Sequence, residues 1–293
     1  MNQKPLISIV MNCFNGEAFL KEAIDSVISQ SYDNWELIFW DNQSTDDSEL
    51  IIKKYLDPRI RYFKSKEHTL LGTARNEALN LADGKWVAFL DVDDLWSEKK
   101  LEHQIDIILN SNDDIGFVYG RCELIFSDPN KSNKIFKADE SLPSGEIFNQ
   151  LLYENFIPFV SAIIDKEKFV ALGGFDNNLM HSTDYFMFLK LSEKYPVSVL
   201  QDVCCKYRLH EGNLTNSLRA QGELESIAIV SSFLPKKEAQ DALRYHQAGL
   251  GIAYLRELKF FKALNILLKQ GVFFRFIMRI TSAIKSRTGT FKL

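Results

Sequence analysis

The chain has 293 residues, of which 46% are hydrophobic, and this is enough apolar material for one large domain or two. Its formal net charge of −4 gives no overall basic field, so a nucleic acid is not the expected partner. The charge is uneven, because the stretch from Lys259 to Leu293 contains eight Lys or Arg and no Asp or Glu, which leaves −12 on the remainder. This asymmetry indicates a basic tail with a separate role.

Predicted strands and helices alternate through the first third of the chain. Continuous apolar runs predict strands at residues 6–11, 35–40, 60–63 and 86–90. Helical periodicity and turn residues predict helices at 17–30, from about 46 to just before Asp57, and at 71–82. Such alternation with short connections predicts a parallel sheet that is covered on both faces by helices.

Three carboxylates, Asp91, Asp93 and Asp94, crowd the end of the strand predicted at 86–90. They repel one another, and a hard divalent cation would relieve this repulsion. The carboxyl end of a strand in an open α/β sheet is also where ligands usually bind. The alternative is that Asp93 and Asp94 only begin the next helix, where Asp is common.

The first, second and fourth predicted strands should bring their carboxyl ends to one edge, and the residues there can form a nucleotide site. Phe14 can stack on a base, Asp41 can accept a hydrogen bond from its ring, and Asp91 can reach ribose hydroxyls. Arg75 supplies a forked donor for a diphosphate, and Asp93 can hold a cation. Each residue also has a plain structural explanation as a core aromatic, a turn residue or a solvated helix residue.

Two familiar phosphate-binding patterns are absent. The chain has neither G-x-x-x-x-G-K-[ST] nor G-x-G-x-x-G. Their absence disfavours P-loop phosphoryl transfer and dinucleotide redox chemistry.

Four ordered motifs resemble those of family 2 glycosyltransferases, which have the GT-A fold. The likeness covers roughly residues 5–215 and rests on residues 8–16 (SIVMNCFNG), 41–46 (DNQSTD), 72–76 (GTARN) and 89–94 (FLDVDD). It implies inverting transfer of a sugar from a nucleoside-diphosphate donor, with Mn²⁺ or Mg²⁺ at the D-x-D motif. By position, it implies base contacts for Phe14 and Asp41, a diphosphate contact for Arg75, a ribose contact for Asp91 and a metal contact for Asp93. The chain departs from the family pattern at Asn12, where Pro is usual, and at Asn42, where a second Asp is common.

The second half of the resembling region supplies the remaining predicted site residues. A helix that opens near residue 181 carries Asp184, which matches the position of the family's catalytic base, although Thr183 stands where Glu is usual. The base takes the proton of an acceptor hydroxyl while that oxygen attacks the anomeric carbon. The alternative for Asp184 is a first-turn residue that is stabilised by the helix dipole. His210 resembles a third metal ligand, and a structural histidine is its alternative.

Three further expectations concern the segments between and around these motifs. A helix is predicted at 97–110 and a strand at 115–119, and the polar stretch 127–144 is predicted to be a mobile loop. The four cysteines include no C-x-x-C pair, so we expect thiols in a reducing compartment. With no signal-peptide core and no apolar run of about 18 residues, we expect a cytoplasmic protein without a transmembrane helix.

The C-terminal region is predicted to be helical beyond the last motif. The pattern of residues 248–269 predicts a helical hairpin. Because only one copy of this hairpin is found, the sequence does not indicate a repeat protein. Arg275 and Arg279 lie one helical turn apart among bulky apolar residues, which is typical of a helix at a membrane surface. The alternative is a tail helix that packs on the domain with both arginines in water. The acid-free terminus favours contact with an anionic membrane, at the inner face of the cell membrane.

These observations predict a GT-A glycosyltransferase domain at 1–215, with a mixed, mostly parallel sheet, followed by a helical region at 216–293. Residues 1–115 would form the nucleotide-binding half of the domain and 116–215 the acceptor-binding half. The expected activity is metal-dependent transfer from a nucleoside-diphosphate sugar to a glycan or lipid-linked acceptor, in cell-surface polysaccharide or glycolipid assembly. One rival is a sugar-phosphate nucleotidyltransferase, which usually has a Gly-rich, Arg-containing N-terminal loop that is missing here. The other is a non-catalytic subunit that binds sugar nucleotides.

Overall fold

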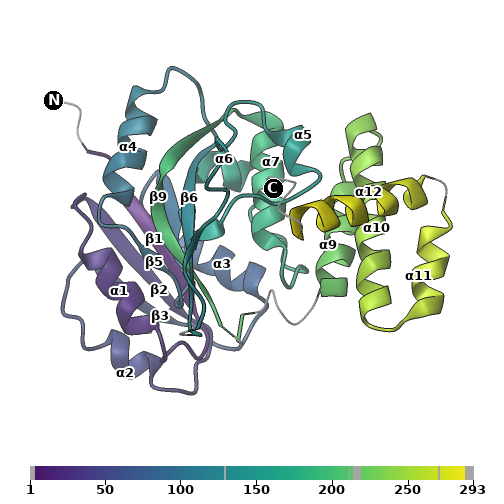
Figure 1. Ribbon diagram of the computed structural model, residues 1–293. Helices are drawn as coiled ribbons and strands as arrows, with labels where there is room; N and C mark the ends of the chain where they lie inside the picture. The colour runs from purple at the N-terminus through teal and green to yellow at the C-terminus, as the bar shows by residue number, and fades with distance from the viewer. Residues whose placement is uncertain (1–3, 129, 211, 214–218, 270, 288–293) are drawn as a thin grey trace. The chain divides into compact units, whose positions relative to one another are not determined.

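The computed structural model describes residues 4–128, 130–210, 212–213, 219–269 and 271–287. The chain divides into two compact units, one made of residues 1–147 and 156–210 and the other of residues 148–155 and 211–293 (Figure 1). The boundary predicted at residue 215 lies outside the described residues and stays a prediction. The short segment 148–155 belongs with the C-terminal helices, although it lies inside the domain expected at 1–215.

The first unit is built on a nine-stranded mixed sheet with the order β3-β2-β1-β4-β8-β6-β9-β5, and β7 pairs with β6. The strands from β3 to β4 in that order are parallel, and β8 is antiparallel to both of its neighbours. This arrangement confirms the predicted mixed α/β architecture. The strands are β1 (Ile7–Cys13), β2 (Trp35–Asp41), β3 (Ile60–Lys64), β4 (Trp86–Phe89), β5 (Leu95–Trp96), β6 (Phe117–Phe126), β7 (Lys134–Ile135), β8 (Ile163–Asp165) and β9 (Val197–Leu209).

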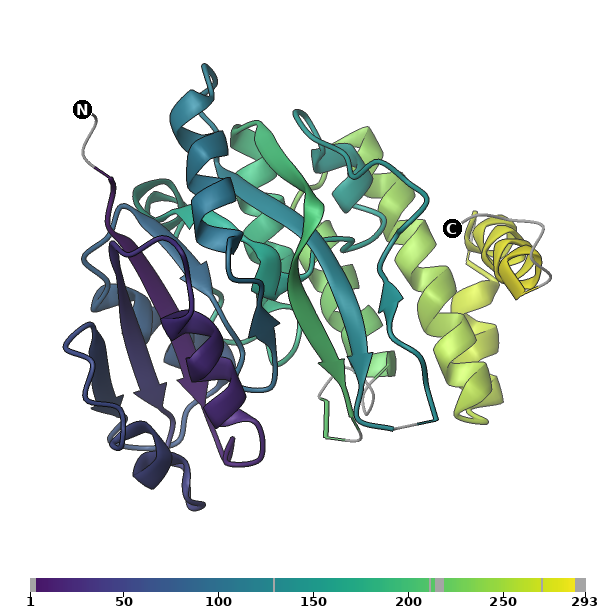
Figure 2. The same cartoon turned by 60° about the vertical axis from the view of Figure 1, so that its left-hand side comes forward.

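Helices cover both faces of this sheet (Figures 1 and 2). Alternate residues of β1, including Ile7, Ile9 and Met11, join a core with side chains of α1 and α4. On the opposite face α3 packs on β1 and β2, and the Phe188 ring of α7 lies 5.2 Å from the ring of Phe117. Burial on both faces explains why the strands read as continuous apolar runs. The helices are α1 (Leu20–Ile28), α2 (Ser48–Ile52), α3 (Leu71–Asn80), α4 (Lys100–Asn110), α6 (Lys166–Ala171), α7 (Thr183–Lys194) and the 3₁₀ helix η1 (Phe159–Ser161).

Two segments differ from the elements predicted for them. The helix expected from about residue 46 to just before Asp57 is limited to α2, because the N–H groups of Lys54 and Tyr55 bond three residues back and end it in tight turns. The stretch 127–144, expected to be a loop, contains β7. Hydrogen bonds also fix the backbone of this stretch, because the Arg121 guanidinium donates to the carbonyl oxygens of Phe136, Lys137 and Glu140.

The second unit is helical and is organised around α10, which contacts α9, α11 and α12. A small apolar core joins Ala248 of α10 to Leu267 and Val272. The predicted hairpin is present as α10 and α11. In the part of the chain that the structure describes, no helix has the length and apolar character needed to span a bilayer. The helices of this unit are α5 (Phe148–Leu151), α9 (Arg219–Ser231), α10 (Lys237–Arg256), α11 (Phe260–Leu267) and α12 (Val272–Arg287).

Arg275 and Arg279 of α12 point into the second unit. Arg279 Nη2 lies 3.1 Å from Glu223 Oε1, and its Nη1 donates to the carbonyl oxygen of Tyr245 at 3.0 Å. Arg275 Nη2 lies 3.8 Å from Asp241 Oδ1. The tail helix therefore packs within this unit with both arginines in ion pairs rather than free in water, and its contact with a membrane stays a prediction. Acidic side chains on α9 and α10 bind the cations instead, which the sequence of the tail alone does not reveal.

Gly72 allows the first turn of α3 to approach the backbone near Asp176. A Cβ atom at position 72 would lie 2.1 Å from the Asp176 carbonyl oxygen. The Asn76 side chain fixes the same contact, since its amide donates to Phe175 O and accepts from Phe175 N, both at 2.9 Å. This junction sets the position of α3 against the segment that leads into α7.

Replacing Gly72 with Ala should therefore lower the free energy of unfolding by about 1–3 kcal/mol, because the backbone must shift to relieve the clash. The measurement is chemical denaturation followed by circular dichroism. Gly222→Ala is the control, because a Cβ at that helical position meets no described atom within 4 Å apart from its chain neighbours and the backbone of its own helix. The control should be unchanged or more stable by about 0.5–1 kcal/mol. Equal stability of Gly72→Ala and the wild type would contradict the tight junction.

Candidate functional site

The carboxyl ends of β2, β1 and β4 lie side by side in the sheet. Cys13 is the register partner of Asp41, and Val10 is the partner of Phe89. The predicted convergence of the three strand ends is therefore confirmed. The segments that follow these strands carry most of the predicted site residues.

The three aspartates after β4 lie in different environments. The side chain of Asp91 is 37% exposed and that of Asp93 is 25% exposed, whereas Asp94 is buried. Asp94 Oδ1 accepts the backbone N–H of Arg208 at 2.8 Å, but its buried Oδ2 has no hydrogen-bond partner among the residues that the structure describes. Burial, followed by the charges of Asp93 and Asp91, raises the pKa of Asp94 well above its usual value. Negative charge is therefore costly here, and a bound cation would lower that cost.

Arg75 connects the end of β4 to the start of α7. Its Nη2 lies 3.3 Å from Asp91 Oδ1, and its Nη1 donates to Thr183 Oγ1 at 2.6 Å. The guanidinium also lies 3.9 Å from the ring centroid of Phe159. Arg75 is buried. It is therefore a fixed cation of the site, and the solvated alternative for it is wrong.

Asp184 belongs to the same electrostatic cluster. Partial burial raises the pKa of Asp91, the positive charge of Arg75 opposes that rise, and the charges of Asp93 and Asp184 add to it. Asp184 lies in the first turn of α7, directly after the Thr183 that binds Arg75. The structure thus brings the predicted catalytic carboxylate close to the predicted donor-binding residues.

His210 and Asp93 meet although they are 117 residues apart in sequence. His210 Nε2 lies 3.0 Å from Asp93 Oδ2. Arg208 supports this pair by donating from Nε to the Asp93 carbonyl oxygen at 2.9 Å, while its Nη2 lies 2.8 Å from Glu22 Oε2. Arg208 is a residue of this site to which the sequence motifs gave no role. Its position two residues before His210 is the sequence feature that could have indicated its supporting role.

The spacing of Asp93 and His210 suits a shared metal ion. Two ligands bound at about 2.1 Å and at right angles to one ion lie about 3.0 Å apart. Among the described residues, no group of three or more His, Cys, Asp or Glu side chains is arranged to hold a metal. These two side chains would therefore leave several coordination positions for phosphate oxygens and water, which is how Mg²⁺ is commonly held.

The side chains beyond β1 and β2 form the other part of the site. Phe14 is 51% exposed, and its ring centroid lies 4.3 Å from that of His68, which the sequence analysis did not single out. Asp41 is fully buried, with Oδ1 accepting the Ser44 N–H at 2.7 Å and Oδ2 accepting the Tyr62 hydroxyl at 3.0 Å. The predicted contact of Asp41 with a base stays a prediction. It requires Asp41 to become accessible when a nucleotide binds.

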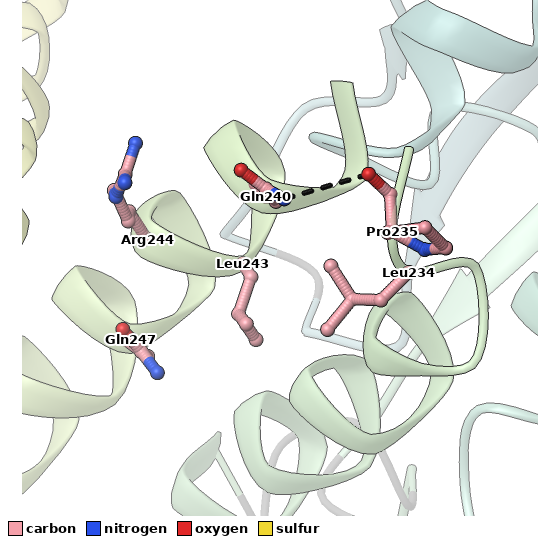
Figure 3. A pocket seen from close by; sticks show the side chains of 6 residues that line it. All are labelled: Leu234, Pro235, Gln240, Leu243, Arg244 and Gln247. Carbon is pink, nitrogen blue, oxygen red and sulfur yellow. Dashed lines mark hydrogen bonds between the residues drawn. The ribbon is translucent and has the colours of Figure 1, made fainter. Parts of the chain in front are cut away.

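A separate hollow lies in the helical unit and does not include any of these side chains (Figure 3). It contains one charged residue, Arg244, whose guanidinium lies 3.1 Å from Asp241 Oδ1. Gln240 Nε2 donates to the Pro235 carbonyl oxygen at 3.4 Å across it. With no carboxylate in its lining, the hollow offers no group for acid-base chemistry or metal binding. Its lining residues are Leu234, Pro235, Gln240, Leu243, Arg244 and Gln247.

Comparison with protein families matches residues 8–168, more than half of the chain, to the family described as Glycosyl transferase family 2. The chain belongs to this family. The match includes the motifs that carry Phe14, Asp41, Arg75 and the aspartates after β4.

Two bacterial proteins named as glycosyltransferases are similar over most of the chain. The UDP-Glc:alpha-D-GlcNAc-diphosphoundecaprenol beta-1,3-glucosyltransferase WfgD of Escherichia coli is 31% identical over 214 residues, which is 72% of this chain and 80% of that protein. The glycosyltransferase TuaG of Bacillus subtilis, named for teichuronic acid biosynthesis, is 29% identical over 219 residues, which is 74% of this chain and 84% of TuaG.

Solved structures show that this family 2 glycosyltransferase has the GT-A fold. Residues 1–349 of Staphylococcus aureus TarS, in complex with UDP-GlcNAc, align with a TM-score of 0.66 and 19% identity over 96% of this chain and 81% of that one. The mannosyltransferase PcManGT of Pyrobaculum calidifontis, in complex with GDP-Man and Mn²⁺, aligns with a TM-score of 0.64 and 17% identity. That alignment covers 99% of this chain and 84% of PcManGT.

The contact between Arg75 and Asp91 predicts a measurable shift in titration. In Arg75→Met the pKa of Asp91 should rise further, because the positive charge that lowers it is removed while burial and the neighbouring carboxylates remain. Carbon-13 NMR titration of the aspartate carboxyl groups measures this change. Arg59→Met should leave the pKa of Asp91 unchanged, since Arg59 pairs with Asp57. An unchanged pKa in Arg75→Met would contradict the contact.

Proposed function

We propose that this glycosyltransferase holds the diphosphate of a nucleoside-diphosphate sugar with Arg75, Asp93 and His210 and activates the acceptor hydroxyl with Asp184. One observation carries the proposal: the Arg75 guanidinium joins Asp91, at the end of β4, to Thr183, next to Asp184. Donor-binding and acid-base groups are thereby held in one site by a cation that cannot lose its proton.

The residues of the site divide the reaction between them. The Arg75 fork binds phosphate oxygens and stabilises the negative charge that grows on them as the sugar departs. Asp93 and His210 would hold a divalent cation, Mn²⁺ or Mg²⁺, which supplies further charge stabilisation for the leaving diphosphate. Phe14 offers an exposed ring for the base, and Asp91 faces the ribose. Asp41 either contacts the base or, from its buried position, holds the loop at residues 41–44.

Asp184 acts on the acceptor in this proposal. Its carboxylate takes the proton of an acceptor hydroxyl as that oxygen forms a bond to the anomeric carbon. The bond from the anomeric carbon to the diphosphate breaks on the opposite side, and the nucleoside diphosphate leaves with the bonding electrons. The new linkage then has the inverted configuration. A first-turn position on α7 also stabilises the charged form of this base.

The relatives guide the choice of substrates. The name of WfgD specifies a UDP-linked glucose donor and a lipid-linked GlcNAc-diphosphate acceptor, and the TarS and PcManGT structures hold UDP-GlcNAc and GDP-Man. We infer a nucleoside-diphosphate hexose or N-acetylhexosamine as donor and a glycan or lipid-linked glycan as acceptor, in cell-surface polysaccharide or glycolipid assembly. With such an acceptor, we infer that the enzyme works in the cytoplasm, peripherally at the inner face of the membrane.

Two other functions make different predictions. A nucleotidyltransferase would release pyrophosphate, and the chain lacks the Gly-rich, Arg-containing N-terminal loop usual in that class. A non-catalytic subunit would bind sugar nucleotides without needing a base at position 184.

Asp184→Asn should lower transfer by a factor of roughly 10²–10⁴, the usual contribution of a general base, because the amide cannot accept the proton. Donor affinity should change little, since the substitution keeps the shape of the side chain. Release of nucleoside diphosphate is measured from UDP-glucose, UDP-GlcNAc and GDP-mannose with a synthetic GlcNAc-diphosphate lipid, and donor affinity by calorimetry. Glu167→Gln, at an exposed position in the first turn of α6, is the matched control. Wild-type transfer by Asp184→Asn would overturn this assignment.

Asp93→Ala should remove the effect of metal on donor binding. We expect Mn²⁺ to raise the affinity of the wild type for its donor by about tenfold or more, a difference of about 1.4 kcal/mol. In the variant, calorimetry should give the same weak affinity with Mn²⁺ and with a chelator. The exposed Asp113→Ala serves as control. A metal effect of equal size in Asp93→Ala would exclude Asp93 as a ligand.

A further inference from the structure

Helices α11 and α12 expose a group of large apolar side chains. Phe261 is 91% exposed, Leu268 73% and Phe274 66%. Clusters of exposed aromatic and aliphatic residues of this size are uncommon on proteins without a partner for them. We call the whole group the outer apolar face, and it consists of Phe260, Phe261, Leu264, Leu268, Phe273 and Phe274.

The opposite sides of both helices are fixed to the rest of the unit. Leu267 of α11 and Val272 of α12 are buried against Ala248 of α10. The ion pair of Arg279 with Glu223 holds α12 in the same orientation. Gly249 makes room for this pair, because a Cβ there would lie 2.1 Å from both Arg279 Nη1 and Glu223 Oε1. Arg275 and Arg279 therefore bind the inner side of the unit, whereas Phe273 and Phe274 of the same helix are exposed.

The charges on and beside α11 are mainly positive, although Lys259 pairs with Glu257 at 2.6 Å. Lys259, Lys262 and Lys269 are all exposed on or beside α11. From Lys259 to the end of the sequence there is no acidic residue. If a second copy of the chain docked face to face, the cations of the two copies would come together and repel one another. An anionic surface would instead attract them.

We propose that the outer apolar face docks on the surface of a membrane that contains anionic lipid. The phenylalanine and leucine side chains enter the boundary between headgroups and acyl chains, and the lysines contact the headgroups. Arg275 and Arg279 take no part in the contact, because they are bound to α9 and α10. The contact would bring the enzyme to its proposed lipid-linked acceptor, and this role of the contact rests on the proposed function. Lipid binding itself requires no donor and no transfer.

The experiment is co-sedimentation of the full-length protein with vesicles. Vesicles of phosphatidylcholine mixed with phosphatidylglycerol are compared with vesicles of phosphatidylcholine alone. The wild type should bind the anionic vesicles, and the double variant Phe261→Glu, Phe274→Glu should bind them about tenfold or more weakly. Lys262→Gln with Lys269→Gln should reduce binding to anionic vesicles and leave binding to neutral vesicles unchanged. Leu56→Glu is the matched control, since Leu56 is 92% exposed and lies in the first unit.

Several results would overturn the proposal. One is failure of the wild type to bind anionic vesicles, and another is equal binding by the wild type and the Phe261→Glu, Phe274→Glu variant. A third is a wild-type dimer in sedimentation velocity that the same variant dissociates, since this would assign the face to a second copy of the chain. Vesicle binding is measured without donor, so its failure can be told apart from a failure of the proposed function. Loss of vesicle binding with transfer to a water-soluble acceptor retained would contradict only the membrane contact. Vesicle binding without transfer would contradict only the proposed function. Circular dichroism checks that the variants are folded.

Discussion

The site depends on keeping several carboxylates close together at the end of β4. The charges of Asp93 and Asp184 act on Asp91, and those of Asp93 and Asp91 act on the buried Asp94. Such a cluster is costly unless cations stand beside it. Arg75 binds Asp91, while Arg208 donates from its side chain to the Asp93 carbonyl oxygen and from its backbone N–H to Asp94 Oδ1. The same crowding that requires these arginines also makes the site attractive to a divalent cation.

The sheet explains why the carboxylates are held where a donor can reach them. β1, β2 and β4 are buried and largely apolar, so the polar groups of the site lie at or just beyond their carboxyl ends. Parallel pairing brings those ends to one edge. This part of the fold could be predicted from the sequence, because apolar runs, turn residues and carboxylates follow one another in the chain itself. The placement of Phe14, Asp91 and Asp93 followed from the same pattern.

Other features depend on contacts between distant residues, which no local pattern reveals. Arg75 was predicted as a diphosphate ligand, but its bond to Thr183 joins residues 108 positions apart. Tyr62 covers Asp41, a carboxylate that the sequence suggested would face a base. Arg121 holds the carbonyl groups of a stretch that reads as a polar loop. In α12, the spacing of Arg275 and Arg279 was read correctly as one helix face, but the acidic partners that turn this face inward lie on α9 and α10.

The central claim is that one site, formed by Arg75, Asp93 and His210, holds the diphosphate of a sugar donor. It is tested most directly by a crystal structure of the protein with Mn²⁺ and the nucleoside diphosphate that binds it most tightly among UDP, GDP, CDP and ADP. We predict phosphate oxygens within hydrogen-bond distance of the Arg75 guanidinium and a metal ion that contacts Asp93, with the base against Phe14. A nucleotide bound elsewhere, with Arg75 and Asp93 keeping their present partners and no metal beside them, would contradict the account.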